Sequence, residues 1–313
     1  MSDKAEHKRV LVIVGPTAVG KTDLAIDLAE RIDGEIISAD SRLFYRGMDI
    51  GTAKPTKIQM GKVPHHLIDC AEPEEIWSLS VYREKAYKCI DVILARNKVP
   101  MIVGGTGQYI RSITEGWELP KQEPNEAMRG VLEDWVKTIG PEELHKKLQL
   151  IDSDAAKEID WTNVRRTIRA LEVIFLTGKR FSEQRRRSDP RYDFWIFGLD
   201  RPRSELYERI DQRVEEMFKQ GLVDETRRLL EKGLSPENPN LSAIGYRETA
   251  LCLNSNLTLA EAKQEMKKKT REFVRRQRNW FKPDDPAIHW FDMSETTLEE
   301  IVTKLRVDRV IEK

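Results

Sequence analysis

Short apolar runs near the start of the sequence are separated by segments whose apolar residues recur at helical spacing. The run VLVIV, Val10 to Val14, ends in Gly15 and predicts a buried parallel strand. Leu24, Leu28 and Ile32 then recur every four residues, which predicts a helix directly after a glycine-rich turn.

The same alternation continues as far as Leu119. EIISAD predicts a second strand with Asp40 at its carboxyl end, and Val81 to Ala95 predicts a helix. VPMIVGGTG predicts another strand, which runs into a glycine turn. Strands that alternate with helices predict an α/β fold, in which helices cover both faces of a parallel sheet.

The pattern changes near Leu119. The polar stretch LPKQEPNEAM, which contains two prolines, predicts a hinge or linker. Residues 125–187 show helical patterns, YDFWIFGLD at 192–200 returns to a strand pattern, and residues 202–282 predict helices. We therefore expect a first part of the core at 1–122, an all-helical insertion domain at 123–188, and a second part of the core, a strand followed by helices, at 189–313.

The composition excludes several classes of protein. Lys+Arg 53 balance Asp+Glu 53 in the 313 residues, so any nucleic-acid binding must come from local patches. The N-terminal MSDKAEHKRV lacks the apolar segment of a signal peptide, and no apolar run approaches the ~20 residues of a membrane span. We expect a soluble cytoplasmic protein with no membrane partner. Cys70, Cys89 and Cys252 are far apart and predict reduced thiols instead of a zinc or disulfide site.

The turn after the first strand, GPTAVGKT, fits the phosphate-binding pattern G-x-x-x-x-G-K-[ST]. Its backbone N–H groups and the positive end of the next helix would converge on an anion. Lys21 supplies a charge, and the Thr22 hydroxyl is placed for Mg²⁺ or a phosphate oxygen. The motif does not name a reaction, because any diphosphate would fit, although nucleoside triphosphates are its commonest ligands. The predicted diphosphate-binding residues are Gly15, Pro16, Thr17, Ala18, Val19, Gly20, Lys21 and Thr22.

Asp40 follows a strand and therefore lies on the carboxyl edge of the predicted sheet, where open α/β sheets bind ligands. The phosphate-binding loop lies on the same edge. A carboxylate there can accept a proton or hold Mg²⁺. A role in a turn or helix cap is the alternative.

The chain as a whole resembles the bacterial tRNA dimethylallyltransferases, also called tRNA isopentenyltransferases. This resemblance implies a P-loop NTPase-like parallel sheet flanked by helices, with a helical insertion and a helical C-terminal part. It also implies that a dimethylallyl group moves from dimethylallyl diphosphate to N6 of the adenosine just 3′ of the anticodon, with diphosphate as the leaving group. The matching segments, in family order from residue 10 to about 292, are GPTAVGKT, DSRLFYRGMDIGTAKP, PHHLID, GGTGQYI, VRRTIRALEV, RIDQRV, IGYRE and RRQRNWF.

The resemblance implies roles for single residues. Lys21, Mg²⁺ and Arg213, in RIDQRV, would stabilise the charge that grows on the diphosphate. Asp40 would take the proton of the adenine amine, and Thr106, in GGTG, would contact the amine or the donor. From spacing alone, Arg213 fits a solvated helix face and Thr106 a plain turn. The common pattern has Gln where this chain has Leu43, so recognition of the adenine edge there must come from the backbone or other groups.

Two basic patches favour an RNA partner. Residues 161–187 carry eight basic side chains against two acidic ones, and residues 263–282 carry nine against two and include the aromatics of NWF. Basic runs are commonly solvated helix faces, but two in a neutral chain favour phosphate contacts, and aromatics can stack on an extruded base. By resemblance, the contacts with the anticodon stem-loop of tRNA are Asp40, Ser41, Arg42, Leu43, Thr106, Arg129, Arg166, Thr167, Ile168, Arg169, Ala170, Ala243, Ile244, Gly245, Tyr246, Arg247, Glu248, Arg276, Gln277 and Arg278.

Two other functions fit the phosphate-binding loop. A nucleoside- or nucleotide-type kinase would bind ATP and close an arginine-rich lid, which Arg185 to Arg187 could supply. An NTP-driven RNA-binding switch would need a strand that ends in Asp, whereas VPMIVGGTG ends in glycines. The kinase predicts ATP consumption, the switch predicts RNA-stimulated hydrolysis, and the transferase predicts diphosphate release only with donor and RNA together. We expect no structural zinc and a monomer.

Overall fold

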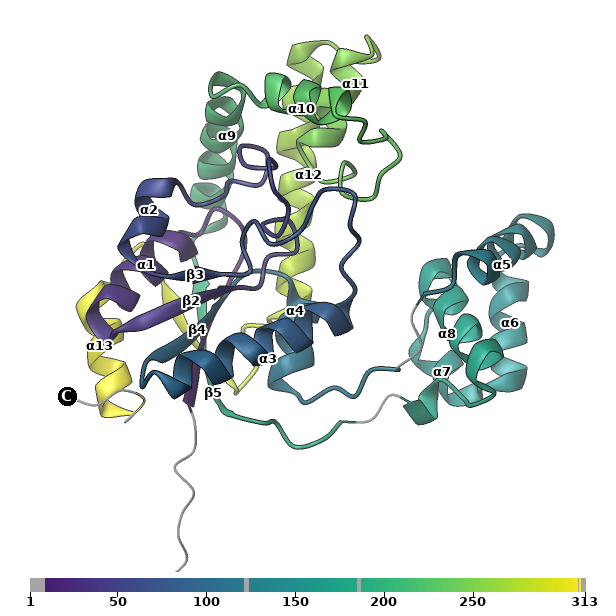
Figure 1. Ribbon diagram of the computed structural model, residues 1–313, viewed down its shortest axis with the longest axis horizontal. Helices are drawn as coiled ribbons and strands as arrows, with labels where there is room; N and C mark the ends of the chain where they lie inside the picture. The colour runs from purple at the N-terminus through teal and green to yellow at the C-terminus, as the bar shows by residue number, and fades with distance from the viewer. Residues whose placement is uncertain (1–8, 121–123, 185–186, 309, 311–313) are drawn as a thin grey trace, which may run out of the picture. The chain divides into compact units, whose positions relative to one another are not determined.

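The computed structural model describes residues 9–120, 124–184, 187–308 and 310, and the chain divides into two compact units (Figure 1). The first unit comprises Met1–Ile110 together with Tyr192–Lys313, and the second comprises Arg111–Arg191. The insertion that the sequence placed at 123–188 falls inside the second unit, which begins before it and ends after it.

The first unit is built on a 6-stranded sheet with the order β3-β2-β4-β1-β5-β6. Every pairing is parallel, as the alternation of strands and helices predicted. The edge strands β3 and β6 were not predicted, because β3 has only 2 residues and the IHWFD of β6 mixes polar and aromatic residues. The strands are β1 Arg9–Val14, β2 Gly34–Ser38, β3 His65–His66, β4 Val99–Val103, β5 Asp193–Asp200 and β6 Ile288–Asp292.

The central strand β1 is buried on both of its faces. Leu11 and Ile13 belong to a core cluster that they share with residues of helices α1 and α13. Val10 and Val12 point to the opposite face and are equally buried, and on that face α3 packs against β2 and β4. Burial on both faces explains why the strand is a continuous apolar run. The helices around the sheet are α1 Lys21–Ile32, α2 Lys57–Lys62, α3 Leu79–Ala95 and α13 Leu298–Val307, while α4 Gly107–Thr114 contains the boundary between the two units.

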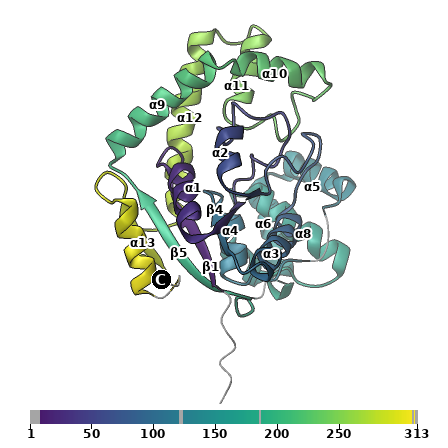
Figure 2. The same ribbon diagram turned by 60° about the vertical axis from the view of Figure 1, so that its left-hand side comes forward.

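Four helices, which follow β5 and precede β6 in the sequence, complete the first unit (Figure 2). The longest, α12, packs against α9 and α11, and α10 packs against the same two helices. Thr258 begins α12 with a capping box, in which its side chain and that of Glu261 each bond to the backbone of the other residue. Among the described residues, no helix is long and apolar enough to cross a membrane. These helices are α9 Arg203–Lys219, α10 Leu222–Glu231, α11 Tyr246–Leu253 and α12 Leu259–Trp280.

The second unit is helical, as the sequence predicted, and has its own apolar core. Leu132, Leu144, Leu148 and Leu171 are buried together in this core. One isolated antiparallel bridge, between Trp117 and Arg187, interrupts the helical pattern among the described residues of the unit. The helices are α5 Glu126–Ile139, α6 Pro141–Ile151, α7 Ser153–Glu158 and α8 Val164–Thr177, followed by the 3₁₀ helix η1 Ser182–Gln184.

Candidate active site at the carboxyl edge of the sheet

The phosphate-binding loop joins β1 to α1 at the carboxyl edge of the sheet. Gly20 has a left-handed conformation (φ 106°), which costs little in a residue without a side chain, and α1 begins directly after it. The unpaired N–H groups of the first helical turn and the positive end of the helix dipole therefore lie beside the loop. Thr22 lies in this turn, and no hydrogen bond within the described residues engages its hydroxyl. The loop is shaped to hold an anion.

The Lys21 ammonium folds back over the loop. Its Nζ donates to the carbonyl oxygens of Gly15 (3.0 Å) and Pro16 (2.8 Å). Burial lowers the pKa of Lys21 to about 8, the charge of Asp40 opposes this shift, and the charge of Arg213 adds to it. Lys21 therefore lies within electrostatic reach of both predicted catalytic groups, Asp40 and Arg213.

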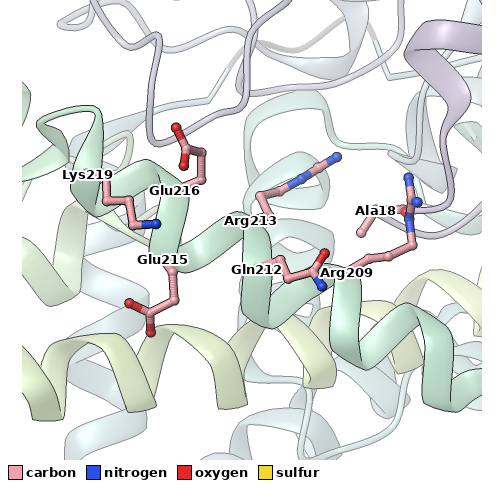
Figure 3. A pocket seen from close by; sticks show the side chains of 7 residues that line it. All are labelled: Ala18, Arg209, Gln212, Arg213, Glu215, Glu216 and Lys219. Atoms are coloured by element: carbon pink, nitrogen blue, oxygen red, sulfur yellow. The ribbon is translucent and has the colours of Figure 1, made fainter.

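Arginines on α9 hold the opposite side of the loop. Arg209 Nε donates to the carbonyl oxygen of Ala18 (2.7 Å). Arg213 Nη1 donates to the Thr17 hydroxyl at the longer distance of 3.4 Å. Figure 3 shows both arginines on one helix together with Lys219. These residues and Ala18 line a cavity of about 500 Å³. The cavity is also lined by Gln212, Glu215 and Glu216.

Asp40 and Thr106 come from the ends of the neighbouring strands β2 and β4, and the backbone ties them together. The Thr106 hydroxyl accepts the N–H of Ser41 (3.2 Å), and the N–H of Thr106 donates to Ala39 (3.3 Å). The Asp40 Oδ1 accepts the N–H of Arg42 (3.0 Å), so this carboxylate does form the turn that was its alternative role. No hydrogen bond within the described residues reaches its Oδ2, which leaves an oxygen for a proton or a cation.

The distinctive GMDIGT segment is anchored by a buried carboxylate on α10. Glu225, only 4% exposed, accepts the N–H groups of three consecutive residues and one hydroxyl. The donors are Asp49 N (3.1 Å), Ile50 N (3.0 Å), Gly51 N (3.1 Å) and Tyr246 Oη (2.6 Å). Glu225 therefore holds residues 49–51 of this segment against α10.

The IGYRE segment was predicted to touch tRNA, but two of its side chains are enclosed. Tyr246 is bound to Glu225, and burial and then this carboxylate raise the pKa of its hydroxyl. Glu248 accepts the N–H of Gly245 and the ammonium of Lys269, both at 2.7 Å. Both side chains are 0% exposed and offer no surface to RNA in this conformation. Ala243 is also buried, whereas Arg247 is exposed, so a direct contact stays a prediction for Arg247.

The last turns of α12 also contain residues predicted to touch tRNA, and they differ in exposure. Arg276 is exposed. Arg278 is half-buried and donates to both carboxylate oxygens of Asp200 (2.7 and 2.8 Å). Gln277 is buried and bonded to the phosphate-binding loop. The structure therefore leaves Arg276 as the residue of this triplet that is best exposed to an RNA.

In the second unit, the buried carboxylate of Glu172 organises two of the predicted tRNA contacts. It accepts Arg129 Nε (3.0 Å) and Arg169 Nη1 (2.6 Å), together with the backbone N–H of Asn125 (2.6 Å). The two guanidinium groups are therefore held side by side. The predicted contacts Thr167, Ile168 and Ala170 are buried and Arg166 is half-buried, while Arg185 and Arg186 lie outside the described residues.

Two residues that hold the loop were missed in the sequence. Arg209 stands four residues before Arg213, so a helical spacing could have identified it. Arg201, which donates to Val19 (3.1 Å), follows no local pattern and meets the loop only through packing.

Oxygen ligands for a metal are sparse at this edge. Among the described residues there is no group of three or more His, Cys, Asp or Glu side chains that could hold a metal ion. The Thr22 hydroxyl and the Asp40 carboxylate are hard oxygen donors of the kind that Mg²⁺ prefers. Such a pair fits Mg²⁺ that is held jointly with the oxygens of a bound diphosphate, which is the usual arrangement for this ion.

Comparison with protein families gives two matches along the chain. A family model described as IPP transferase matches residues 43–284, and one described as isopentenyl transferase matches residues 8–70. Together they span both the phosphate-binding loop and the helical insertion.

Individual relatives match over most of the chain. A tRNA dimethylallyltransferase of Thermomicrobium roseum is 44% identical over 290 residues, which are 93% of this chain and 88% of the relative. The crystal structure of a tRNA isopentenylpyrophosphate transferase from Bacillus halodurans is 39% identical, with a TM-score of 0.71 over 97% of this chain and 96% of the other. A eukaryotic dimethylallyltransferase acting on tRNA has a TM-score of 0.80 at 26% identity and covers 97% of this chain and 81% of its own.

Proposed function

The chain belongs to the IPP transferase family of tRNA dimethylallyltransferases, and we propose that it transfers a dimethylallyl group to N6 of the adenosine 3′ of the anticodon. The donor is dimethylallyl diphosphate and the second product is diphosphate. The observation that carries the proposal is the meeting of an anion-binding loop and a carboxylate at one edge of the sheet, where the charge of Asp40 acts on Lys21. A kinase that uses ATP is not favoured by the comparisons.

The first part of the reaction is departure of the diphosphate. As the carbon–oxygen bond breaks, its electron pair moves to the diphosphate oxygen and negative charge grows there. Lys21, Arg213 and Arg209 lie around the loop and would stabilise this charge more strongly in the transition state than in the ground state. In the free enzyme, the Lys21 ammonium donates to two loop carbonyls. On binding, the diphosphate of the donor would replace these carbonyls as the acceptor.

The second part is attack by the adenine amine. The nitrogen lone pair forms the new carbon–nitrogen bond, and Asp40 takes the proton that the nitrogen loses, with Oδ2 as the acceptor. The Thr106 hydroxyl accepts the Ser41 N–H, so its own hydrogen can be donated to the bridging oxygen of the donor or to the adenine. In this proposal the base and the hydrogen-bond donor follow the ends of two neighbouring strands.

Magnesium fits the same edge. The Thr22 hydroxyl, together with oxygens of the diphosphate, would hold the ion. When bound, Mg²⁺ would neutralise part of the charge on the leaving diphosphate. The residues of the chain would still bind the donor and remove the proton.

For the tRNA, an exposed arginine in the first unit and a partly exposed arginine pair in the second support contacts with phosphates. Arg276 lies on α12, and the pair of Arg129 and Arg169 on Glu172 lies in the second unit. An Arg pair that is held by a carboxylate loses little side-chain entropy when it binds a phosphate. A tRNA substrate favours a cytoplasmic site of action, and the monomer that we expect would suffice because both groups of residues lie on one chain.

The test uses purified protein, Mg²⁺, labelled dimethylallyl diphosphate and an anticodon stem-loop RNA with adenosine after the anticodon. We expect label on that RNA and none on a control stem-loop with guanosine at this position. ATP in place of the donor should not be consumed. If ATP is consumed and no RNA is labelled, the transferase assignment is wrong and the kinase or switch takes its place.

A further inference from the structure

The buried side chain of Gln277 connects two loops of the active site. Gln277 lies on α12 and is 5% exposed. Its Oε1 accepts the N–H of Thr17 in the phosphate-binding loop (2.9 Å), and its Nε2 donates to the carbonyl oxygen of Gly105 in the GGTG turn (3.2 Å). The partners fix the orientation of the amide, because an N–H needs an oxygen acceptor and a carbonyl needs an N–H donor.

The GGTG turn is shaped around the end of α12. A Cβ added to Gly105 would lie 2.1 Å from Nε2 of Gln277, and one added to Gly107 would lie 2.1 Å from Cγ of Trp280. A side chain at either position would therefore displace Gln277 or Trp280, because side chains of α12 occupy that space. Thr106 stands between the two glycines, so the place of its hydroxyl depends on this contact.

Thr17 is held from a second side as well. Its hydroxyl accepts Arg213 Nη1 (3.4 Å), while its N–H is taken by Gln277. A single residue of the loop therefore joins α12 to Arg213, the arginine proposed to stabilise the diphosphate. Gln277 thus reaches Arg213 through two hydrogen bonds that share Thr17, and it bonds to Gly105, the residue next to Thr106.

We propose that Gln277 is a positioning residue for prenyl transfer, which sets the distance between the phosphate-binding loop and the Thr106 turn and does not touch the RNA. The proposal rests on the proposed function and replaces the tRNA contact that the sequence suggested for Gln277. Without the Gln277 side-chain amide, no hydrogen bond from this position links the phosphate-binding loop to the turn that contains Thr106. Displacements of about 1 Å at a reacting centre lower rates by up to about 100-fold.

The experiment compares Gln277→Ala and Gln277→Met with Gln264→Ala. Met keeps most of the buried volume but makes neither hydrogen bond, and Gln264 is an exposed glutamine on the same helix. We expect kcat at saturating donor and stem-loop RNA to fall about 10- to 100-fold in both Gln277 variants. The Kd for the stem-loop should stay within about twofold of the parent value, because no RNA contact is removed.

Hydrogen exchange of the Thr17 amide gives a readout that does not depend on activity. Exchange should be faster in both Gln277 variants than in the parent and in Gln264→Ala, because the amide has lost its acceptor. A weaker stem-loop Kd with unchanged kcat would show that Gln277 contacts RNA and would overturn the proposal. Parent-like kcat in Gln277→Met would also overturn it, since volume alone would then suffice.

The two proposals fail in distinguishable ways. If the parent and Gln264→Ala do not label the stem-loop, the proposed function is wrong, while the exchange experiment still decides whether Gln277 holds the loop. If they do label it and the Gln277 variants label it equally fast, only the positioning role is wrong.

Discussion

The ammonium of Lys21 should make binding of diphosphate depend on pH in the range where most lysines do not titrate. The pKa of Lys21 is about 8 in the folded chain because the group is buried. The charged fraction of Lys21 therefore falls from about 90% at pH 7 to about 10% at pH 9. Because the anion binds to the charged form, the affinity for diphosphate should fall about tenfold over this range. Lys21→Arg remains charged over this range and should lack the loss.

Isothermal titration calorimetry of the parent and Lys21→Arg with pyrophosphate at pH 7, 8 and 9 measures the effect. Protonation of pyrophosphate itself affects both proteins equally. The ratio of their affinities therefore reports only the protonation of Lys21. A ratio that does not change between pH 7 and pH 9 would refute the placement of Lys21 as a buried ammonium on the diphosphate.

The lowered pKa of Lys21 also makes the free energy of unfolding depend on pH. The pKa of Lys21 is 10.5 when unfolded and about 8 when folded, so the unfolded chain binds more protons between these pH values. The contribution of Lys21 to the free energy of unfolding therefore rises with pH through this window. In denaturant titrations, the free energy of unfolding should increase more between pH 8 and pH 10 for the parent than for Lys21→Met.

Other substitutions test the remaining groups. Asp40→Asn should lower kcat about 10²- to 10⁴-fold, since the base is lost, with stem-loop Kd in a binding titration nearly unchanged; weaker RNA binding with normal kcat would contradict this role. Glu172→Ala should unpair its partly exposed arginines and destabilise the second unit by roughly 1–3 kcal/mol in urea unfolding, whereas a loss below 1 kcal/mol would mean that the carboxylate is not structural. Glu225→Ala removes the acceptor of three N–H groups, and limited proteolysis should then cut the GMDIGT segment faster; unchanged cleavage would show another anchor.

Local patterns were sufficient for the elements of the core. The β-branched run of β1, the glycine-rich turn and the helical spacing of α1 depend only on neighbouring residues, and the structure confirms them. The strand β3 could not be read in this way, because its 2 residues are too few to form a pattern. The order of the strands also depends on pairings between distant segments, such as β1 with β5.

The sequence by itself determined the glycine-rich loop before α1, the parallel sheet and the carboxylate at its edge, because each follows from residue types at short spacing. Only the tertiary structure decided which motif residues face a ligand and which hold the site together. Tyr246 and Gln277 stand in motifs that suggest RNA contact, yet both side chains are buried. Their partners, Glu225 and Thr17, lie 21 and 260 residues away. Exposure and pairing at such separations are set by packing, and no local pattern of residues records them.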